Sequence, residues 1–184
     1  MHHRDMRKIF PADSGEVLLN PGMGYLFLQR GHRKVRFDEL APGEWFLSRP
    51  LSDKIIFDVA WSVVEPEEGR FDWENPAWEG CMQSWIDAGF KVGLQIRGMG
   101  ANGTFRNDGT PQWVFDAGAG FIDEPGPPDG PPRRYPVYWD PVYLEKSANF
   151  IAAFGERYNR NPAVEMVFQG FLGHFGEMHL SEHT

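Results

Sequence analysis

Short apolar runs alternate along the chain with polar and glycine-containing segments, and their lengths predict the secondary structure. Residues 24–28 form a short run of aliphatic and aromatic residues, and residues 54–60 add β-branched side chains, so we predict a strand at both places. Residues 90–96 and 164–171 have the same character and predict a third and a fourth strand. Longer intervals separate these strands.

Two of those intervals have the periodicity of amphipathic helices. Residues 76–88 bring apolar side chains to one face, and Gly89 is placed to end the helix. That face comprises Trp78, Met82, Trp85 and Ile86. Residues 141–158 predict a second helix, whose inner side we expect to comprise Leu144, Phe150, Ile151 and Phe154.

The alternation of strands and helices predicts a parallel sheet with right-handed crossovers, and hence an α/β fold. Two architectures fit: an open doubly wound sheet, or a partial (β/α)8 TIM barrel of about the first four βα units. The doubly wound sheet would favour a nucleotide site at a glycine-rich turn. Residues 98–103 match G-x-G-x-x-G, but the following residues are turn-like and open no helix, so we expect no nucleotide site.

The longest interval, about residues 98–140, has no clear periodicity. Its residues 125–132 read Pro-Gly-Pro-Pro-Asp-Gly-Pro-Pro, which excludes a helix because proline lacks the backbone donor. We therefore predict a long irregular loop, and loops of that length are usually functional or disordered.

The composition fits one globular domain and excludes several classes of function. The chain has 184 residues, a formal net charge of −8 and no run of Lys or Arg, which argues against a nucleic acid partner. Its one cysteine, Cys81, excludes an intramolecular disulfide and a cysteine-based zinc site. We find no apolar run of membrane-spanning length and no signal peptide, so we expect a cytoplasmic protein with no membrane partner.

Three groups of residues follow the ends of predicted strands, where parallel α/β folds place their sites. The first, W-S-x-x-E-P-x-x-G-x-F-D-W over residues 61–73, resembles the segment after the second barrel strand of (β/α)8 glycoside hydrolases, closest to the family 42 β-galactosidases and related clan A enzymes. We interpret Glu65, Phe71 and Trp73 as residues that shape this loop. Trp61 fits either packing or a sugar-stacking floor.

The second group joins Arg97, at the end of the third strand, to Thr110-Pro111-Gln112-Trp113. A T-P-x-W segment in this place is similar to the same families, in which it lines the substrate cleft. Arg97 is suited to orient a catalytic carboxylate or a sugar hydroxyl, and a surface ion pair is the alternative. Trp113 fits either a stacking position or a core position.

The third group, residues 170–179, carries Glu177 just after the fourth strand. The resemblance to clan A hydrolases implies that Glu177 is the general acid/base, with Phe175 and Trp61 as an apolar wall that raises its pKa. The chain departs from the clan at Gly176, where those enzymes usually have an asparagine. A solvated loop carboxylate is the alternative for Glu177.

The same group also allows a metal-dependent hydrolase that uses His174, Glu177 and His179, with His183 nearby. The spacing matches neither H-E-x-x-H nor H-x-x-E-H, so we expect no metal and no other cofactor. We assign the remaining candidates to carbohydrate binding: Arg97, Trp61, Trp113, Trp139, His174 and His179.

The resemblance implies that residues 20–184 form the N-terminal half of a glycosidase barrel, truncated after strand four and preceded by an extension over residues 1–19. The whole barrel would hydrolyse O-glycosidic bonds of β-galactoside-like or related carbohydrates. Because such enzymes need two carboxylates, we expect this chain alone to be inactive. The alternative is a non-catalytic carbohydrate-binding protein that uses Trp61, Trp113 and Trp139. Half a barrel has open sheet edges, through which we expect self-association.

Overall fold

The computed structural model of the protein describes residues 25–29, 34–41, 52–104, 109–125, 132–173 and 176–178. The predicted extension over residues 1–19 lies outside these ranges. Within them, no helix combines the length and the apolar character needed to cross a membrane.

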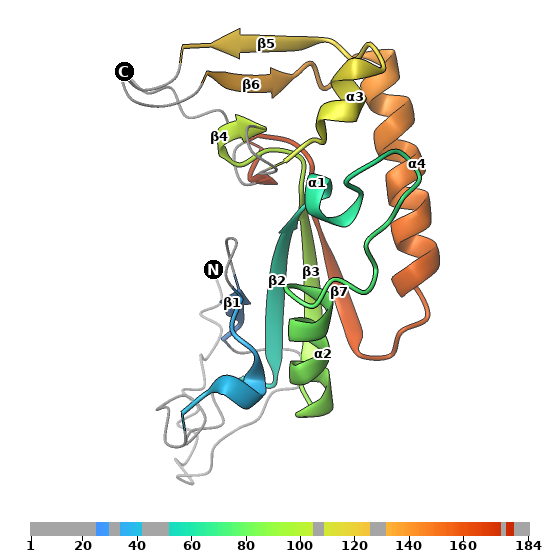
Figure 1. Cartoon of the computed structure of the whole chain (residues 1–184). Helices are drawn as coiled ribbons and strands as arrows, with labels where there is room; N and C mark the ends of the chain where they lie inside the picture. Colours follow the sequence, from blue (N-terminus) through green and yellow to red (C-terminus); the bar gives the residue numbers. More distant parts are fainter. Residues whose placement is uncertain are drawn as a thin grey trace, which may run out of the picture.

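Four parallel strands form the main sheet, as the alternation of elements predicts (Figure 1). In the order in which they pair, they are β1 (Phe27–Gln29), β2 (Lys54–Ala60), β3 (Lys91–Arg97) and β7 (Val164–Gly170). The predicted strands differ from these bounds by at most three residues at an end, and β2 agrees with its prediction. Neighbours in the sheet follow one another along the chain, as in the first half of a (β/α)8 barrel.

The carboxyl ends of three neighbouring strands lie level with one another. Ala60 at the end of β2 pairs with Arg97 at the end of β3, and Arg97 pairs with Gly170 at the end of β7. A register shift between Val92 and Gly93 adjusts β7 to β3. Because the strands are parallel, the residues that follow them are gathered at a single edge of the sheet.

Two helices, α2 (Glu79–Asp87) and α4 (Pro141–Tyr158), pack against the sheet (Figure 1). A single helical turn, α1 (Trp61–Val64), directly follows β2. A short 3-10 helix, η1 (Phe37–Glu39), adjoins α2. The apolar face predicted for residues 76–88 is confirmed. Trp78, just before α2, is buried, as are Met82 and Trp85 on α2, and Ile86 is half-buried.

The helix α4 begins where it is predicted because Asp140 caps it. The Asp140 carboxylate accepts hydrogen bonds from the N–H groups of Val142 and Tyr143. The predicted inner side is wrong at Leu144 and Ile151, which are 52% and 55% exposed. The side of α4 that is buried includes Tyr143 and Phe150, each one position before an exposed residue of the predicted side. It includes two tyrosines and a serine, residue types that a search for apolar side chains leaves out. The buried residues of α4 are Tyr143, Ser147, Phe150, Phe154 and Tyr158.

A second, smaller sheet replaces part of the predicted irregular loop, above the carboxyl ends of β2 and β3 (Figure 1). Its region comprises β4 (Ala101–Thr104), α3 (Gln112–Asp116), β5 (Phe121–Glu124) and β6 (Arg133–Pro136). Arg134 holds the β5–β6 hairpin, because its guanidinium binds Asp123 at 2.7 and 2.8 Å and lies 3.7 Å from the ring centroid of Phe121. The proline-rich residues 126–131 lie outside the described part of the chain.

An apolar groove of about 290 Å³ lies between α4 and β7, which is the outer strand of the main sheet as the structure describes it. Its lining includes Val167 and Phe168, which are 61% and 36% exposed. Exposed apolar strand edges are templates for association between chains. Self-association through the β7 edge stays a prediction.

We expect the chain to self-associate at micromolar concentration and Val167→Lys to shift it toward the monomer, because an edge lysine opposes strand pairing. Sedimentation velocity measures this shift. Ile122→Lys replaces an exposed aliphatic residue on β5, away from the groove, and should leave the distribution unchanged. A monomeric wild-type chain, or equal effects of both substitutions, would contradict a role for the β7 edge.

Candidate functional site

Glycines bring the ends of β3 and β7 into direct backbone contact at the carboxyl edge of the sheet. A Cβ atom at Gly98 would lie 2.7 Å from the carbonyl oxygen of Phe171, and one at Gly170 would lie 2.3 Å from that of Ile96. Side chains do not fit at such distances. We call the residues of this contact the glycine junction: Gly98, Gly109, Gly170 and Gly176.

Glu177 directly follows this junction. A Cβ atom at Gly176 would lie 2.3 Å from the Cα of Gly170, so the loop after β7 folds back onto the strand end. The N–H of Gly176 donates to the carbonyl oxygen of Gly173 at 3.1 Å. Glu177 is exposed and lies at the edge that also carries Arg97, the register partner of Gly170.

The same contact requires a glycine at position 176. Gly176 has a φ of 73°, which strains any residue with a side chain, and its Cβ position is filled by Gly170. The loop is also tied to the segment between β6 and α4, because the Tyr138 hydroxyl accepts the N–H of Gly173 at 3.0 Å. Backbone contacts and one tyrosine thus hold the segment that carries Glu177.

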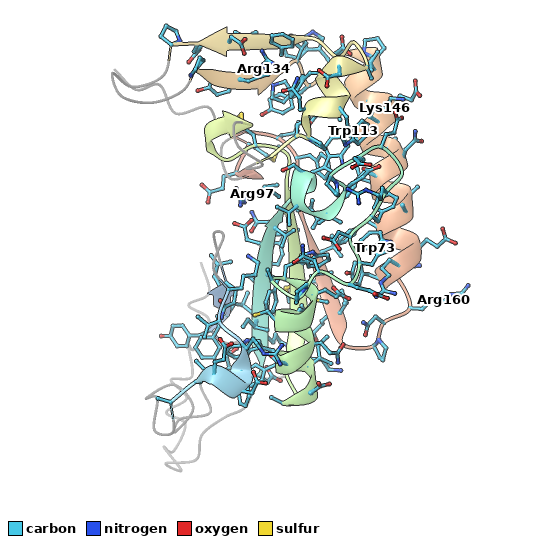
Figure 2. All side chains as sticks on the ribbon, in the orientation of Figure 1. Trp73, Arg97, Trp113, Arg134, Lys146 and Arg160 are labelled. Carbon is cyan, nitrogen blue, oxygen red and sulfur yellow. The ribbon has the colours of Figure 1, made fainter. Side chains whose placement is uncertain are left out.

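Arg97 forms a buried ion pair with Asp58 on the neighbouring strand β2. Its Nε donates to Asp58 Oδ1, and the two residues are 4% and 0% exposed, so the pair is not the surface ion pair of the alternative interpretation. Figure 2 shows Arg97 near the upper ends of β2 and β3. Asp58 was not among the predicted site residues. The available signal was a carboxylate within an apolar strand, since a buried carboxylate needs a compensating cation.

Lys34 adds a second cation beside this pair. Its ammonium group donates to the carbonyl oxygens of Asp58 and, at 3.3 Å, of Gln29, so it bridges β2 and the end of β1. Burial lowers the pKa of Lys34 to about 8, and the attraction of Asp58 opposes that shift. The carboxyl edge therefore holds two cations around one buried carboxylate.

Trp61 is a core residue, which corrects its assignment as a sugar-stacking floor. The side chain is 0% exposed. It lies 5.3 to 6.1 Å, between ring centroids, from four other aromatic rings: Trp113, Tyr143, Phe150 and Phe171. Neighbouring rings therefore occupy the space that a sugar ring would need.

Glu65 holds the loop after α1, in agreement with the loop-shaping interpretation. Its carboxylate accepts hydrogen bonds from the Trp61 indole N–H and the Gly69 backbone N–H, both at 2.8 Å. Burial raises the pKa of Glu65 although both bonds favour the charged form. Phe71 and Trp73 stack on each other with ring centroids 4.7 Å apart, and both pack against α4.

The two remaining candidate tryptophans differ in their exposure. Trp113 on α3 is half-buried, and its indole N–H donates to the carbonyl oxygen of Glu65 at 3.1 Å (Figure 2). Trp139 is 75% exposed just before α4. Of these two, Trp139 leaves more of its indole open to a ligand.

The predicted histidines His174 and His179 lie outside the described residues, as do Phe175 and His183. Among the residues that are described, no three His, Cys, Asp or Glu side chains are arranged to hold a metal ion. Substrate binding and metal binding at these histidines stay predictions.

The four parallel strands and the helices packed on them form an α/β fold in which consecutive strands pair, as they do in part of a (β/α)8 barrel. The chain belongs to glycoside hydrolase family 42: the family model, described as β-galactosidase, matches residues 55–169. No curated protein matches the chain.

Solved structures of endo-glycoceramidase II from Rhodococcus sp. are similar to part of the chain. Complexes with a cellobiose-like imidazole and a cellobiose-like isofagomine each align with a TM-score of 0.41 and 20% identity over 70% of this chain. The alignments cover 33% and 34% of those chains, so this chain spans about a third of their length.

We expect Asp58→Ala to lower the free energy of unfolding by about 3–5 kcal/mol, because it leaves a buried guanidinium without the carboxylate. Asp58→Leu combined with Arg97→Met should recover most of that loss, since replacing both charges with apolar groups is often neutral. Urea unfolding measures both effects. If the double variant is as unstable as Asp58→Ala, Asp58 does not stabilise the fold by pairing its charge with Arg97.

The lowered pKa of Lys34 makes stability depend on pH. Between pH 8 and the ordinary value of 10.5, the unfolded chain holds a proton that the folded chain has lost, so the free energy of unfolding rises with pH. Lys34→Met lacks this rise. We therefore expect its stability relative to wild type to fall as the pH increases from 7.5 to 10 in urea unfolding.

Lys54→Met is the control for this pH dependence. The hydrogen bond to Glu165 raises the pKa of Lys54 above its ordinary value. The stability of Lys54→Met relative to the wild type should therefore not fall between pH 7.5 and 10. Parallel stability curves for the wild type and Lys34→Met would contradict the lowered pKa.

Proposed function

We propose that the protein hydrolyses O-glycosidic bonds of β-galactoside-like or related carbohydrates, with Glu177 as its general acid/base. Membership of glycoside hydrolase family 42 supports the reaction class. One observation carries the choice of Glu177: it follows Gly176, which packs on Gly170 at the end of the fourth strand of the sheet. Active sites of (β/α)8 barrels lie at this edge.

In this role, the Glu177 carboxyl group gives its proton to the glycosidic oxygen as the bond to the leaving group breaks. In a retaining enzyme the resulting carboxylate later takes a proton from the water that releases the sugar. Both stereochemical courses need a second carboxylate near the sugar ring.

Two other carboxylates near this edge are committed to the fold. Asp58 is buried and binds Arg97, while Glu65 is buried and binds Trp61 and Gly69. We therefore assign the second carboxylate to a segment outside the described residues. Inactivity of the 184-residue chain alone stays a prediction.

The other candidate residues support the proposal in different ways. Arg97 is 4% exposed, so we assign it to holding the carboxyl edge through Asp58 rather than to touching the sugar. Trp139 is 75% exposed and offers an indole face for stacking. That exposure also favours the second candidate function, carbohydrate binding without hydrolysis.

The test assays aryl and alkyl β-galactosides with the chain joined to, or mixed with, segments that complete the barrel. We expect Glu177→Gln to lower kcat/KM by about 10²–10⁴-fold for leaving groups that need a proton, such as an alkoxide. The loss should be much smaller for 2,4-dinitrophenolate, because this group leaves without protonation. Steady-state kinetics across the series measure the difference.

Glu156→Gln, at an exposed position on α4, is the matched control and should leave both kinds of substrate unaffected. An equal loss for both kinds of leaving group in Glu177→Gln would remove Glu177 from the acid/base role. Sugar binding that Trp139→Ala abolishes, without turnover of any glycoside, would favour the carbohydrate-binding function.

A further inference from the structure

Backbone hydrogen bonds tie the residues on both sides of Glu177 to the start of the loop that follows β7. The N–H of Gly176 donates to the carbonyl oxygen of Gly173 at 3.1 Å. The N–H of Met178 donates to the carbonyl oxygen of Leu172 at 2.9 Å. We call these five residues the Glu177 loop. Because both neighbours of Glu177 are bonded to its start, the Glu177 loop responds to a displacement of that start as one unit.

Met178 has a backbone conformation that residues with a side chain disfavour. Its φ is 58°, and in the part of the chain that the structure describes it is the one non-glycine residue with a positive φ. Such a conformation costs free energy and persists only where surrounding contacts hold it. Met178 directly follows Glu177, so the chain beside the proposed acid is held in place against a local cost.

Tyr138 connects the start of the Glu177 loop to the segment before α4. Gly173 is buried, and its N–H donates to the Tyr138 hydroxyl at 3.0 Å. The same hydroxyl donates to the thioether of Met99, which is buried, at 3.5 Å. The ring of Tyr138 lies 5.8 Å from the ring of Tyr143 on α4, between centroids. The phenol is therefore fixed at its ring and uses its hydroxyl both as acceptor and as donor.

We propose that Tyr138 is a positioning residue for Glu177. A buried N–H that loses its acceptor is costly, so without the hydroxyl Gly173 moves toward another acceptor. The backbone bonds within the Glu177 loop carry that displacement to Glu177.

The position of the carboxyl group matters because general acid catalysis needs it within hydrogen-bond reach of the glycosidic oxygen. A displacement of about 1 Å is enough to lower a rate by about 10²-fold. This inference rests on the proposed function, since it takes Glu177 as the acid.

The test compares Tyr138→Phe with the wild type in the completed barrel, over aryl and alkyl β-galactosides. The substitution keeps the ring and removes the hydroxyl. We expect kcat/KM for alkyl galactosides to fall by about 10²-fold. The loss should be much smaller for the 2,4-dinitrophenyl galactoside, whose leaving group needs no proton. A merely structural role of Tyr138 would lower both values alike.

Two variants are controls for this difference. Tyr158→Phe removes a tyrosine hydroxyl that donates to the Glu79 carboxylate at 2.7 Å, at the far end of α4. Any loss that it causes should be equal for the two kinds of leaving group. Met99→Leu removes the other partner of the Tyr138 hydroxyl and keeps the bond to Gly173, so it should leave the series unchanged.

Hydrogen exchange on the 184-residue chain adds a measurement that needs neither turnover nor a folded variant. In the wild type the amide of Gly173 should exchange slowly, because it is buried and bonded to the Tyr138 hydroxyl. Tyr138→Phe should speed up its exchange.

Three results would overturn the positioning role: an equal loss for both kinds of leaving group in Tyr138→Phe, unchanged kinetics in that variant, or fast exchange of the Gly173 amide in the wild type. Glu177→Gln separates this failure from that of the proposed function. An equal loss for both leaving groups in Glu177→Gln would overturn both proposals. A loss that depends on the leaving group in Glu177→Gln but not in Tyr138→Phe would overturn only the role of Tyr138.

Discussion

Direct backbone contact at the glycine junction is the constraint on which the carboxyl edge of the sheet depends. Gly98 and Gly170 let β3 and β7 end against each other, and Gly176 lets the next loop return onto Gly170. A side chain at any of these positions would separate the strands or displace the loop. Because Glu177 directly follows Gly176, its place at the edge is determined by backbone geometry more than by the packing of its own side chain.

Buried charge adds a second constraint, which acts across the strands. The pair of Asp58 and Arg97 joins β2 to β3, and a shift by one residue would turn Asp58 to the opposite face of the sheet. A buried ion pair contributes little net stability but penalises every arrangement in which one partner is missing. The charges of Asp58 and Arg97 also act on the pKa of Lys34. The same ion pair therefore affects both the register of the sheet and the charge at its carboxyl edge.

Elements with a strong periodic pattern could be predicted, whereas features that depend on distant contacts could not. The strand Lys54–Ala60 is rich in β-branched and aromatic residues, and the helix Pro141–Tyr158 has an Asp-Pro start signal. The smaller sheet has strands of four residues, which are too short for periodicity. At the site, the position of a residue just after a strand predicted that it lies at the carboxyl edge of the sheet. It did not predict whether the side chain is buried. Trp61 was misassigned because rings from distant elements cover it, and Asp58 was missed because its partner lies on another strand.

Carbohydrate binding at the carboxyl edge of the sheet is tested most directly by NMR. The amide chemical shifts of the ¹⁵N-labelled chain are followed during a titration with methyl β-galactoside. We expect saturable changes at the glycine junction and in the loop that follows it, with Gly98, Gly170 and Glu177 among the affected amides. Changes confined to the opposite end of the sheet, around Lys54 and Lys91, would contradict a carbohydrate site at the carboxyl edge.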